Sequence, residues 1–239
     1  MIHEPARTPR ERRHDDNFRR ILDAALRMVE SGGIEALSIN KLADEVDYTP
    51  GALYRYFGSK DALLSKLVER VLEDVGGYLA RGQALLPPGA RPLARVVVLV
   101  SSYRAFARHE PQRFGLLAVT MADPRVLLRD PADAAPLVAL MMGALSTVAG
   151  ALGAAAEAGQ LAEGDAAQRA LCVFALVQGA SQMGKQASRA PVLLDVDRLA
   201  MEGTRALLLG FGAKPKAVDA AFELVDSLGD LSVRVGGAS

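Results

Sequence analysis

Apolar residues recur at intervals of three and four along almost the whole 239-residue chain, which is the spacing of one face of an α-helix. Proline and glycine interrupt this pattern repeatedly, so they divide the chain into separate helical segments. The only strand-like run is at residues 96–100, and it fits a buried helix equally well. The sequence therefore predicts an all-α fold.

The composition limits the kinds of site that this chain can carry. Acidic and basic residues balance at 28 each, so a case for a nucleic-acid or membrane partner must come from local charge. The single cysteine, Cys172, excludes an internal disulfide and a cysteine-rich zinc module. The histidines at positions 3, 14 and 109 lack metal-ligand spacing. We expect a cytoplasmic protein with no metal and no cofactor.

One uncharged segment, residues 134–156, is long enough to span a bilayer. Its flanks are Asp133 and Glu157 rather than Lys or Arg, no aromatic belt brackets it, and much of it is Ala and Gly. These features favour a buried helix of a helical domain over a membrane span. The first 20 residues are mostly polar and lack the apolar stretch of a secretory signal.

The N-terminal part is predicted to begin with a mobile arm, residues 1–14, which carries four arginines. This arm is either a solvated tail or a segment that follows DNA electrostatically. The first helix is expected from about Asp15 to the Ser31-Gly32-Gly33 stop. Three more helices are then predicted at 38–46, 49–57 and 59–82, with a turn at Asp47-Tyr48.

Beyond a Pro-Pro-Gly linker at 87–89 the periodicity stays helical. The breaks predict helices at 92–109, 111–121, 134–158, 165–188, 195–210 and 216–228. We accordingly expect two domains: an N-terminal helix-turn-helix domain at 15–75 and a larger helical domain at 90–228.

Two short helices joined by a tight turn and preceded by a third helix are typical of a helix-turn-helix unit. The second short helix starts with the small or polar residues Thr49, Pro50, Gly51 and Ala52, which can approach base edges in the major groove. Polar tips that can donate to phosphate follow at Tyr54, Arg55 and Tyr56. Lys60 opens the next helix, where the helix dipole and a cation both favour phosphate.

The stretches at 33–43 (GIEALSINKLA) and 49–64 (TPGALYRYFGSKDALL) resemble the DNA-binding domain of the TetR family of transcriptional regulators. The resemblance covers about residues 15–75. It implies that Ser38 and Asn40 reach DNA backbone or bases, that Lys41 is a further candidate, and that Tyr54 and Lys60 contact phosphate. Many family members have His where this chain has Tyr56, so the local contact differs.

The resemblance also implies a homodimer and a divergent helical domain that binds a small ligand. Residues 174–179 and 199–210 resemble the two dimerisation helices. Small and flexible side chains in the second domain favour an apolar cavity, although its methionines suit core packing too. The candidate ligand-binding residues are Tyr103, Phe114, Met121, Met141, Met142, Phe174, Gln178 and Gln182. Arg104 or Arg113 could pair with an acidic ligand or face solvent.

These observations predict a sequence-specific DNA-binding transcriptional regulator, a repressor that a small, mainly apolar ligand releases from a double-stranded operator. An enzyme is disfavoured because the chain has no Gly-rich phosphate loop, no G-x-S-x-G and no histidine metal cluster. A purely structural helical dimer would leave the helix-turn-helix pattern unexplained. The operator, the ligand and the choice between repression and activation stay open.

Overall fold

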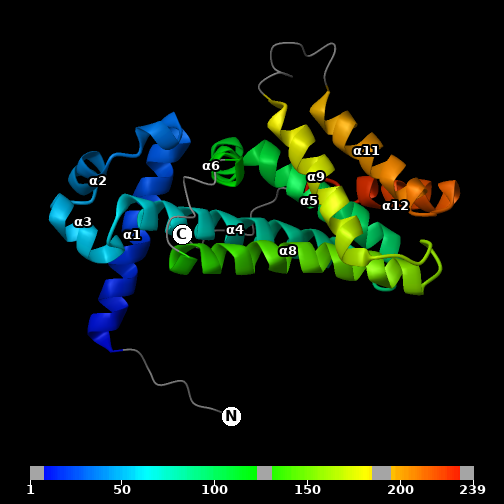
Figure 1. The fold of residues 1–239 in the computed structure, drawn as a ribbon, viewed down its shortest axis with the longest axis horizontal. Helices are drawn as coiled ribbons and strands as arrows, with labels where there is room; N and C mark the ends of the chain where they lie inside the picture. The colour runs from blue at the N-terminus through cyan, green and yellow to red at the C-terminus, as the bar shows by residue number, and fades with distance from the viewer. Residues whose placement is uncertain (1–7, 123–130, 185–194, 232–239) are drawn as a thin grey trace. The chain divides into compact units, whose positions relative to one another are not determined.

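The computed structural model describes residues 8–122, 131–184 and 195–231, and within these ranges every regular element is a helix (Figure 1). The all-α prediction is confirmed. The helices are α1 (Pro9–Gly32), η1 (Ile34–Ala36), α2 (Ile39–Glu45), α3 (Pro50–Phe57), α4 (Lys60–Leu85), α5 (Pro92–His109), α6 (Pro111–Ala122), α8 (Pro131–Glu157), α9 (Ala166–Gln182), α11 (Val196–Gly210) and α12 (Pro215–Ser227).

The chain divides into two compact units. The first comprises Met1–Val71 and Gln112–Leu137, and the second comprises Leu72–Pro111 and Val138–Ser239. Helix α4 runs through the first boundary, so its N-terminal half belongs to one unit and its C-terminal half to the other.

The start of α1 differs from the predicted mobile arm. The helix begins at Pro9, because Thr8 and Glu11 form a reciprocal capping box and Pro9 occupies the first helical position. The backbone N–H of Thr8 donates to Glu11 Oε2 at 2.7 Å, and Glu11 N–H donates to Thr8 Oγ1 at 3.3 Å. Residues 9–14 are therefore helical and Thr8 caps them, whereas residues 1–7 of the predicted arm lie outside the described residues.

The core of the first unit is made by the inward faces of α1 to α4. Ile21, Leu42, Leu63 and Leu67 are fully buried there, and Leu53 is 1% exposed. These residues follow the helical spacing of the sequence, so each short helix presents one apolar face inward and leaves the other to solvent. This arrangement positions α2 and α3 as the two short helices of a helix-turn-helix unit.

In the second unit, α5 is the central helix. Its residues from Val96 to Leu99 are at most 1% exposed, and it packs against α9, α11 and α12. Helix α4 approaches α5 closely at Gly82, where a Cβ atom would lie 2.0 Å from Ser102 Oγ. The apolar run at residues 96–100 is thus part of a buried helix and not a strand, and the sequence allowed both alternatives.

Helix α8 was expected to be buried, and this expectation is wrong. Among the described helices, it is the one whose length and composition would allow it to cross a membrane. Only 17% of its most apolar stretch of 18 residues is buried. Val138 is 51% exposed and Met142 57% exposed. Because almost every position in this segment is apolar, its sequence has no polar side that identifies the exposed face.

Candidate nucleic-acid interface and ligand-binding helices

The turn between α2 and α3 is held by backbone contacts and by one arginine. Asp47 adopts a left-handed backbone with φ of 57°, which Asp tolerates better than most residues. Tyr48 N–H donates to the carbonyl of Ala43 at 2.9 Å. From α1, the Arg20 guanidinium donates to the carbonyl of Val46 at 2.7 Å. The predicted turn at Asp47-Tyr48 is confirmed, and it fixes the direction in which α3 starts.

The first turn of α3 is exposed and capped. Thr49 Oγ1 accepts a hydrogen bond of 3.2 Å from Ala52 N–H, and Pro50 occupies the first turn. Thr49, Pro50 and Gly51 are exposed, and a Cβ atom at Gly51 would meet nothing within 4 Å. This end of α3 is therefore open to a partner. Ala52 is only 7% exposed, which favours a packing role for it over a base contact.

Further polar groups lie beyond this first turn. Tyr54 is 48% exposed and Arg55 is exposed, whereas Leu53 before them and Phe57 after them are buried. Ser59 Oγ accepts from Ala62 N–H at 2.9 Å, so it caps α4 and leaves Lys60 exposed in the first turn.

Helix α2 contributes the remaining predicted DNA contacts. Ser38 is its N-cap residue and is half-buried, with no side-chain capping bond among the described residues. Asn40 and Lys41 are exposed. All the residues predicted to contact DNA thus lie on α2, on α3 and at the start of α4, within the first unit.

Tyr56 lies in an aromatic cluster that the sequence did not reveal. Its ring stacks on His14 of α1, with centroids 5.0 Å apart, and meets the Tyr48 ring edge-on at 6.0 Å. A hydrogen bond with Tyr56 raises the pKa of Tyr48, because the protonated hydroxyl is the form that donates. Arg20 lies over the Tyr48 ring at 5.6 Å. The signal in the sequence that could have indicated this cluster is the aromatic ring of His14, which the sequence analysis considers only as a possible metal ligand.

The predicted ligand-binding residues do not all fall in one unit. Phe114 and Met121 belong to the first unit, and the others belong to the second. Within the second unit, Met142 and Gln182 are exposed and Met141 is half-buried. The structure instead brings together Tyr103, Phe174 and Gln178.

These three residues join α5 to α9. The Tyr103 hydroxyl donates to Gln178 Oε1, and the Tyr103 and Phe174 rings meet edge-on with centroids 6.2 Å apart. Tyr103 and Gln178 are 8% and 7% exposed. Burial raises the pKa of Tyr103 far above its usual range, so the hydroxyl stays protonated. Gln178 Nε2 is buried and has no hydrogen-bond partner among the described residues.

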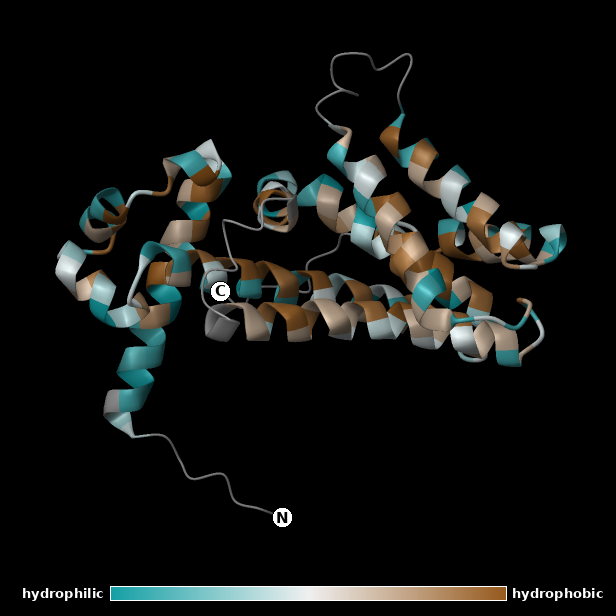
Figure 2. Ribbon diagram, viewed as in Figure 1, coloured by the Kyte–Doolittle hydropathy of each residue, from teal (hydrophilic) through white to brown (hydrophobic). Residues whose placement is uncertain are grey.

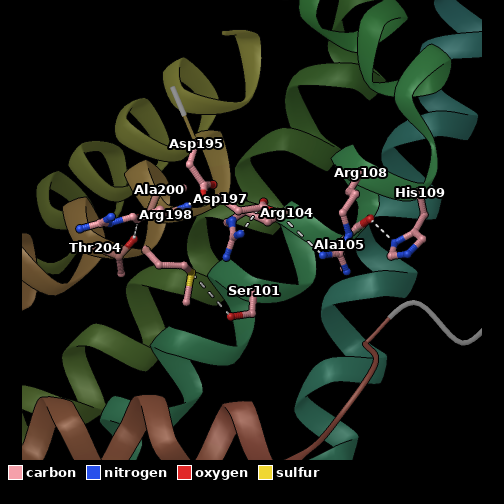
Figure 3. Close-up of polar contacts among 11 residues, drawn as sticks. Ser101, Arg104, Ala105, Arg108, His109, Asp195, Asp197, Arg198, Ala200 and Thr204 are labelled. Carbon is pink, nitrogen blue, oxygen red and sulfur yellow. Dashed lines mark hydrogen bonds and ion pairs between the residues drawn. The ribbon is translucent and has the colours of Figure 1, made fainter. Parts of the chain in front are cut away.

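Arginine residues nearby already have acidic partners. Figure 3 shows Arg104 of α5 paired with Asp197 at the start of α11, and Arg108 approaches the other oxygen of Asp197 at 3.8 Å. Ser101 Oγ also reaches Met201 Sδ at 4.0 Å. In the first unit, Arg113 pairs with Glu30 at 2.7 Å. These contacts anchor helices and leave neither Arg104 nor Arg113 as an unpaired cation for an acidic ligand.

Residues 21–67 match the family model described as "Bacterial regulatory proteins, tetR family". This match covers α2, α3 and the adjoining parts of α1 and α4. A curated relative, the HTH-type transcriptional repressor KstR of Rhodococcus jostii (strain RHA1), is 37% identical over 93 residues, which are 39% of this chain and 42% of KstR. The chain thus spans less than half the length of this relative.

Solved structures extend the likeness in fold to both units. A protein of unknown function from Rhodococcus sp. RHA1 has a TM-score of 0.68 at 22% identity and covers 89% of this chain and 100% of its own. RolR in complex with the ligand resorcinol has a TM-score of 0.59 at 19% identity and covers 90% of this chain and 95% of its own. At these identities the likeness shows the fold: a helix-turn-helix domain followed by a larger helical domain.

Proposed function

We propose that this protein is a sequence-specific DNA-binding transcriptional regulator. The observation that supports this proposal most directly is the exposed first turn of α3, which consists of Thr49, Pro50 and Gly51. This turn lies within the residues that match the TetR family model. Tyr54 and Lys60 flank this turn with groups that can donate to phosphate. Small residues at the start of a recognition helix let the backbone come close to base edges, while the flanking groups set its register on the duplex.

The test is selection from a random-sequence DNA library with the full-length protein, followed by a gel shift with the selected duplex. A regulator of this kind enriches a two-fold symmetric sequence and binds it far more tightly than a scrambled duplex of the same composition. An enzyme or a purely structural dimer enriches nothing. Equal affinity for the selected and scrambled duplexes would contradict the proposal.

The proposed assembly is a homodimer built on α9 and α11, which pack against each other in the second unit. Each carries exposed apolar or small residues at helical spacing: Leu171, Ala175, Gly179 and Met183 on or just after α9, and Leu199, Ala206 and Leu209 on α11. Covering these stripes with a second copy would remove apolar surface from water. Two recognition helices could then read two half-sites, which one alone would bind poorly.

The proposed mode of control is release of the operator by a small, mainly apolar ligand held among α5 and α9. The buried Gln178 Nε2 has two N–H groups to donate and no partner in the described structure, so it suits a ligand with an oxygen acceptor. The paired state of Arg104 gives no support for an acidic ligand. RolR, which shares the fold, was solved with the small aromatic molecule resorcinol.

A ligand can act only by favouring one arrangement of the two DNA-reading domains. Helix α4 is the proposed path, because it is continuous from Lys60 into the second unit. A ligand that prefers the DNA-incompetent arrangement about 100-fold weakens binding by roughly 2.7 kcal/mol. The test is a thermal-shift screen of a small-molecule library, with hits then assayed for release of the selected duplex. Hits that stabilise the protein and never alter DNA affinity would refute the coupling.

A further inference from the structure

We propose that the DNA-binding surface extends from α3 onto the first turns of α1, with Arg13 as a phosphate contact that His14 holds in position. This inference rests on the proposed DNA-binding function. It starts from the finding that residues 9–14, expected as part of an arm, are helical and capped. An arginine on a capped helix has a fixed place relative to the rest of the domain, whereas one on a tail does not.

The first turns of α1 are joined to the recognition helix by aromatic contacts. His14 stacks on Tyr56 at 5.0 Å, and one turn later Phe18 meets Phe57 with centroids 5.1 Å apart. These two contacts lie at positions i and i+4 of α1, on one face of the helix. Figure 1 shows α1 continuing past α3 toward the N-terminus. The N-terminal turns of α1 therefore prolong the surface that α3 presents.

One face of α1 contacts the turn of the helix-turn-helix unit, and Arg13 lies at the N-terminal end of this face. Arg13, Asn17 and Arg20 are spaced i, i+4 and i+7, so they share one face of α1. Arg20 marks where this face points, because its guanidinium bonds the carbonyl of Val46 and covers the Tyr48 ring. Arg13 lies two turns earlier, about 10 Å along the axis, on the same side.

Arg13 is free to take a partner. It is exposed, and it makes no ion pair within the described residues. Another face of α1 carries charges of both signs. Its residues alternate between basic and acidic at helical spacing and are all exposed, as is typical of a solvated face: Arg12, Asp16, Arg19 and Asp23. Figure 2 shows hydrophilic colouring over the N-terminal turns of α1. Arg13 is an exposed arginine on the α3 side that makes no ion pair within the described residues, so it suits a polyanion.

Hydrogen bonding of Tyr56 adds to this surface. Tyr56 is half-buried between the rings of His14 and Tyr48, and a tyrosine hydroxyl can donate a hydrogen bond as well as accept one. A phosphate oxygen between α1 and α3 would then receive a charged group from Arg13 and a hydroxyl from Tyr56.

The experiment measures affinity and its salt dependence for a duplex selected from a random-sequence library by the unmodified protein. Arg13→Gln should weaken binding about three- to tenfold at moderate salt and reduce the slope of log K against log salt by about 0.9 per phosphate lost. The matched control is Arg19→Gln, which removes the same charge from an exposed position of the same helix. It should leave affinity and slope nearly unchanged.

The positioning role of His14 needs a separate pair of variants. His14→Ala removes the ring that stacks on Tyr56, so it should lower the salt slope as Arg13→Gln does, while His14→Phe keeps a stacking ring and should restore the slope. Equal behaviour of Arg13→Gln and Arg19→Gln on DNA that the unmodified protein binds would overturn this inference alone. Failure of the unmodified protein to select any DNA would instead overturn the proposed function.

Discussion

The hydroxyl of Tyr103 on α5 donates a hydrogen bond of 2.5 Å to Oε1 of Gln178 on α9, although 75 residues separate the two in the chain. Both side chains are almost completely buried, and within the part of the chain that the structure describes, Nε2 of Gln178 has no hydrogen-bond partner. A buried polar pair with one unused donor is costly in an apolar interior unless something else satisfies it. This pair therefore links the stability of the second unit to its proposed ligand.

The first prediction concerns this pair. Tyr103→Phe removes the donor to Gln178 Oε1 and leaves the amide buried, so it should reduce the free energy of unfolding by about 1–3 kcal/mol. Adding Gln178→Leu removes the stranded amide, so the double variant should be more stable than the sum of the single effects predicts. Urea unfolding of the four proteins measures this coupling. Strict additivity would show that the two groups are energetically independent.

The second prediction concerns pH. Burial raises the pKa of Tyr103 above its unfolded value of about 10, so the folded state holds the proton more tightly than the unfolded state. The stabilisation is fully present below pH 10 and is lost as pH rises through the folded pKa. Urea unfolding between pH 8 and 11 should show a fall in stability above pH 10 that is smaller in Tyr103→Phe. An identical fall in both proteins would contradict this.

Contacts such as Tyr103–Gln178 mark the limit of prediction from this sequence. Helix bounds followed from local signals: α5 was predicted at 92–109 and runs from Pro92 to His109, because proline begins it and Pro111 follows its end. Which residue of α5 meets which residue of α9 depends on packing between distant segments, and no local pattern encodes it. The candidate ligand residues were accordingly split between the two units, whereas the DNA-contact candidates, which are close in sequence, stayed together.

Two local errors have identifiable causes. Thr8-x-x-Glu11 with Pro9 is a capping-box pattern that indicates a helix start. The arginines and prolines around it favoured a mobile arm instead, so the predicted start of α1 is too late. The helix predicted at 165–188 ends at Gln182 in the structure, with Met183 as its C-cap residue. The spacing of apolar residues does not indicate that the helix ends at Gln182. Residues 185–194 lie outside the described residues.

The third prediction tests the phosphate contacts beside α3. Lys60→Gln removes an exposed cation from the start of α4, so it should weaken binding to all duplexes about equally and flatten the salt dependence. Tyr54→Phe removes one hydroxyl and should cost on the order of 1 kcal/mol in DNA binding without changing the salt slope. Lys66→Gln is the control, because Lys66 pairs with Glu69 at 2.6 Å. Unchanged affinity and slope in both test variants would refute the assignment.

The fourth prediction concerns the cap of α1. Thr8→Ala removes the side-chain oxygen that accepts from Glu11 N–H, so it should destabilise the first turn by about 0.5–2 kcal/mol. Hydrogen exchange of the amides from Glu11 to His14 should become faster, and DNA affinity should fall with it. Thr8→Ser keeps the hydroxyl and should behave like the unmodified protein. Unchanged exchange in Thr8→Ala would show that the His14–Tyr56 stack alone holds these turns.

The last prediction separates packing within one chain from packing between two chains. Gly203 on α11 is an unsuitable probe of the dimer, because a Cβ atom there would lie 2.7 Å from Leu176 Cδ1 on α9 of the same chain. A charged residue at Gly203 would therefore disturb the α9–α11 pair itself. Gly179 is a better probe, because it is exposed and a Cβ atom there would meet nothing within 4 Å.

Gly179→Glu should thus leave the protomer folded and place a charge in the centre of the proposed interface, where an unpaired buried charge is strongly unfavourable. Light scattering should show a dimer for the unmodified protein at micromolar concentration and a monomer for Gly179→Glu, with equal helical content by circular dichroism. Ala220→Glu, at an exposed position of α12, is the matched control and should remain dimeric. A dimeric Gly179→Glu variant would place the interface away from α9, whereas a monomeric unmodified protein would refute the homodimer itself.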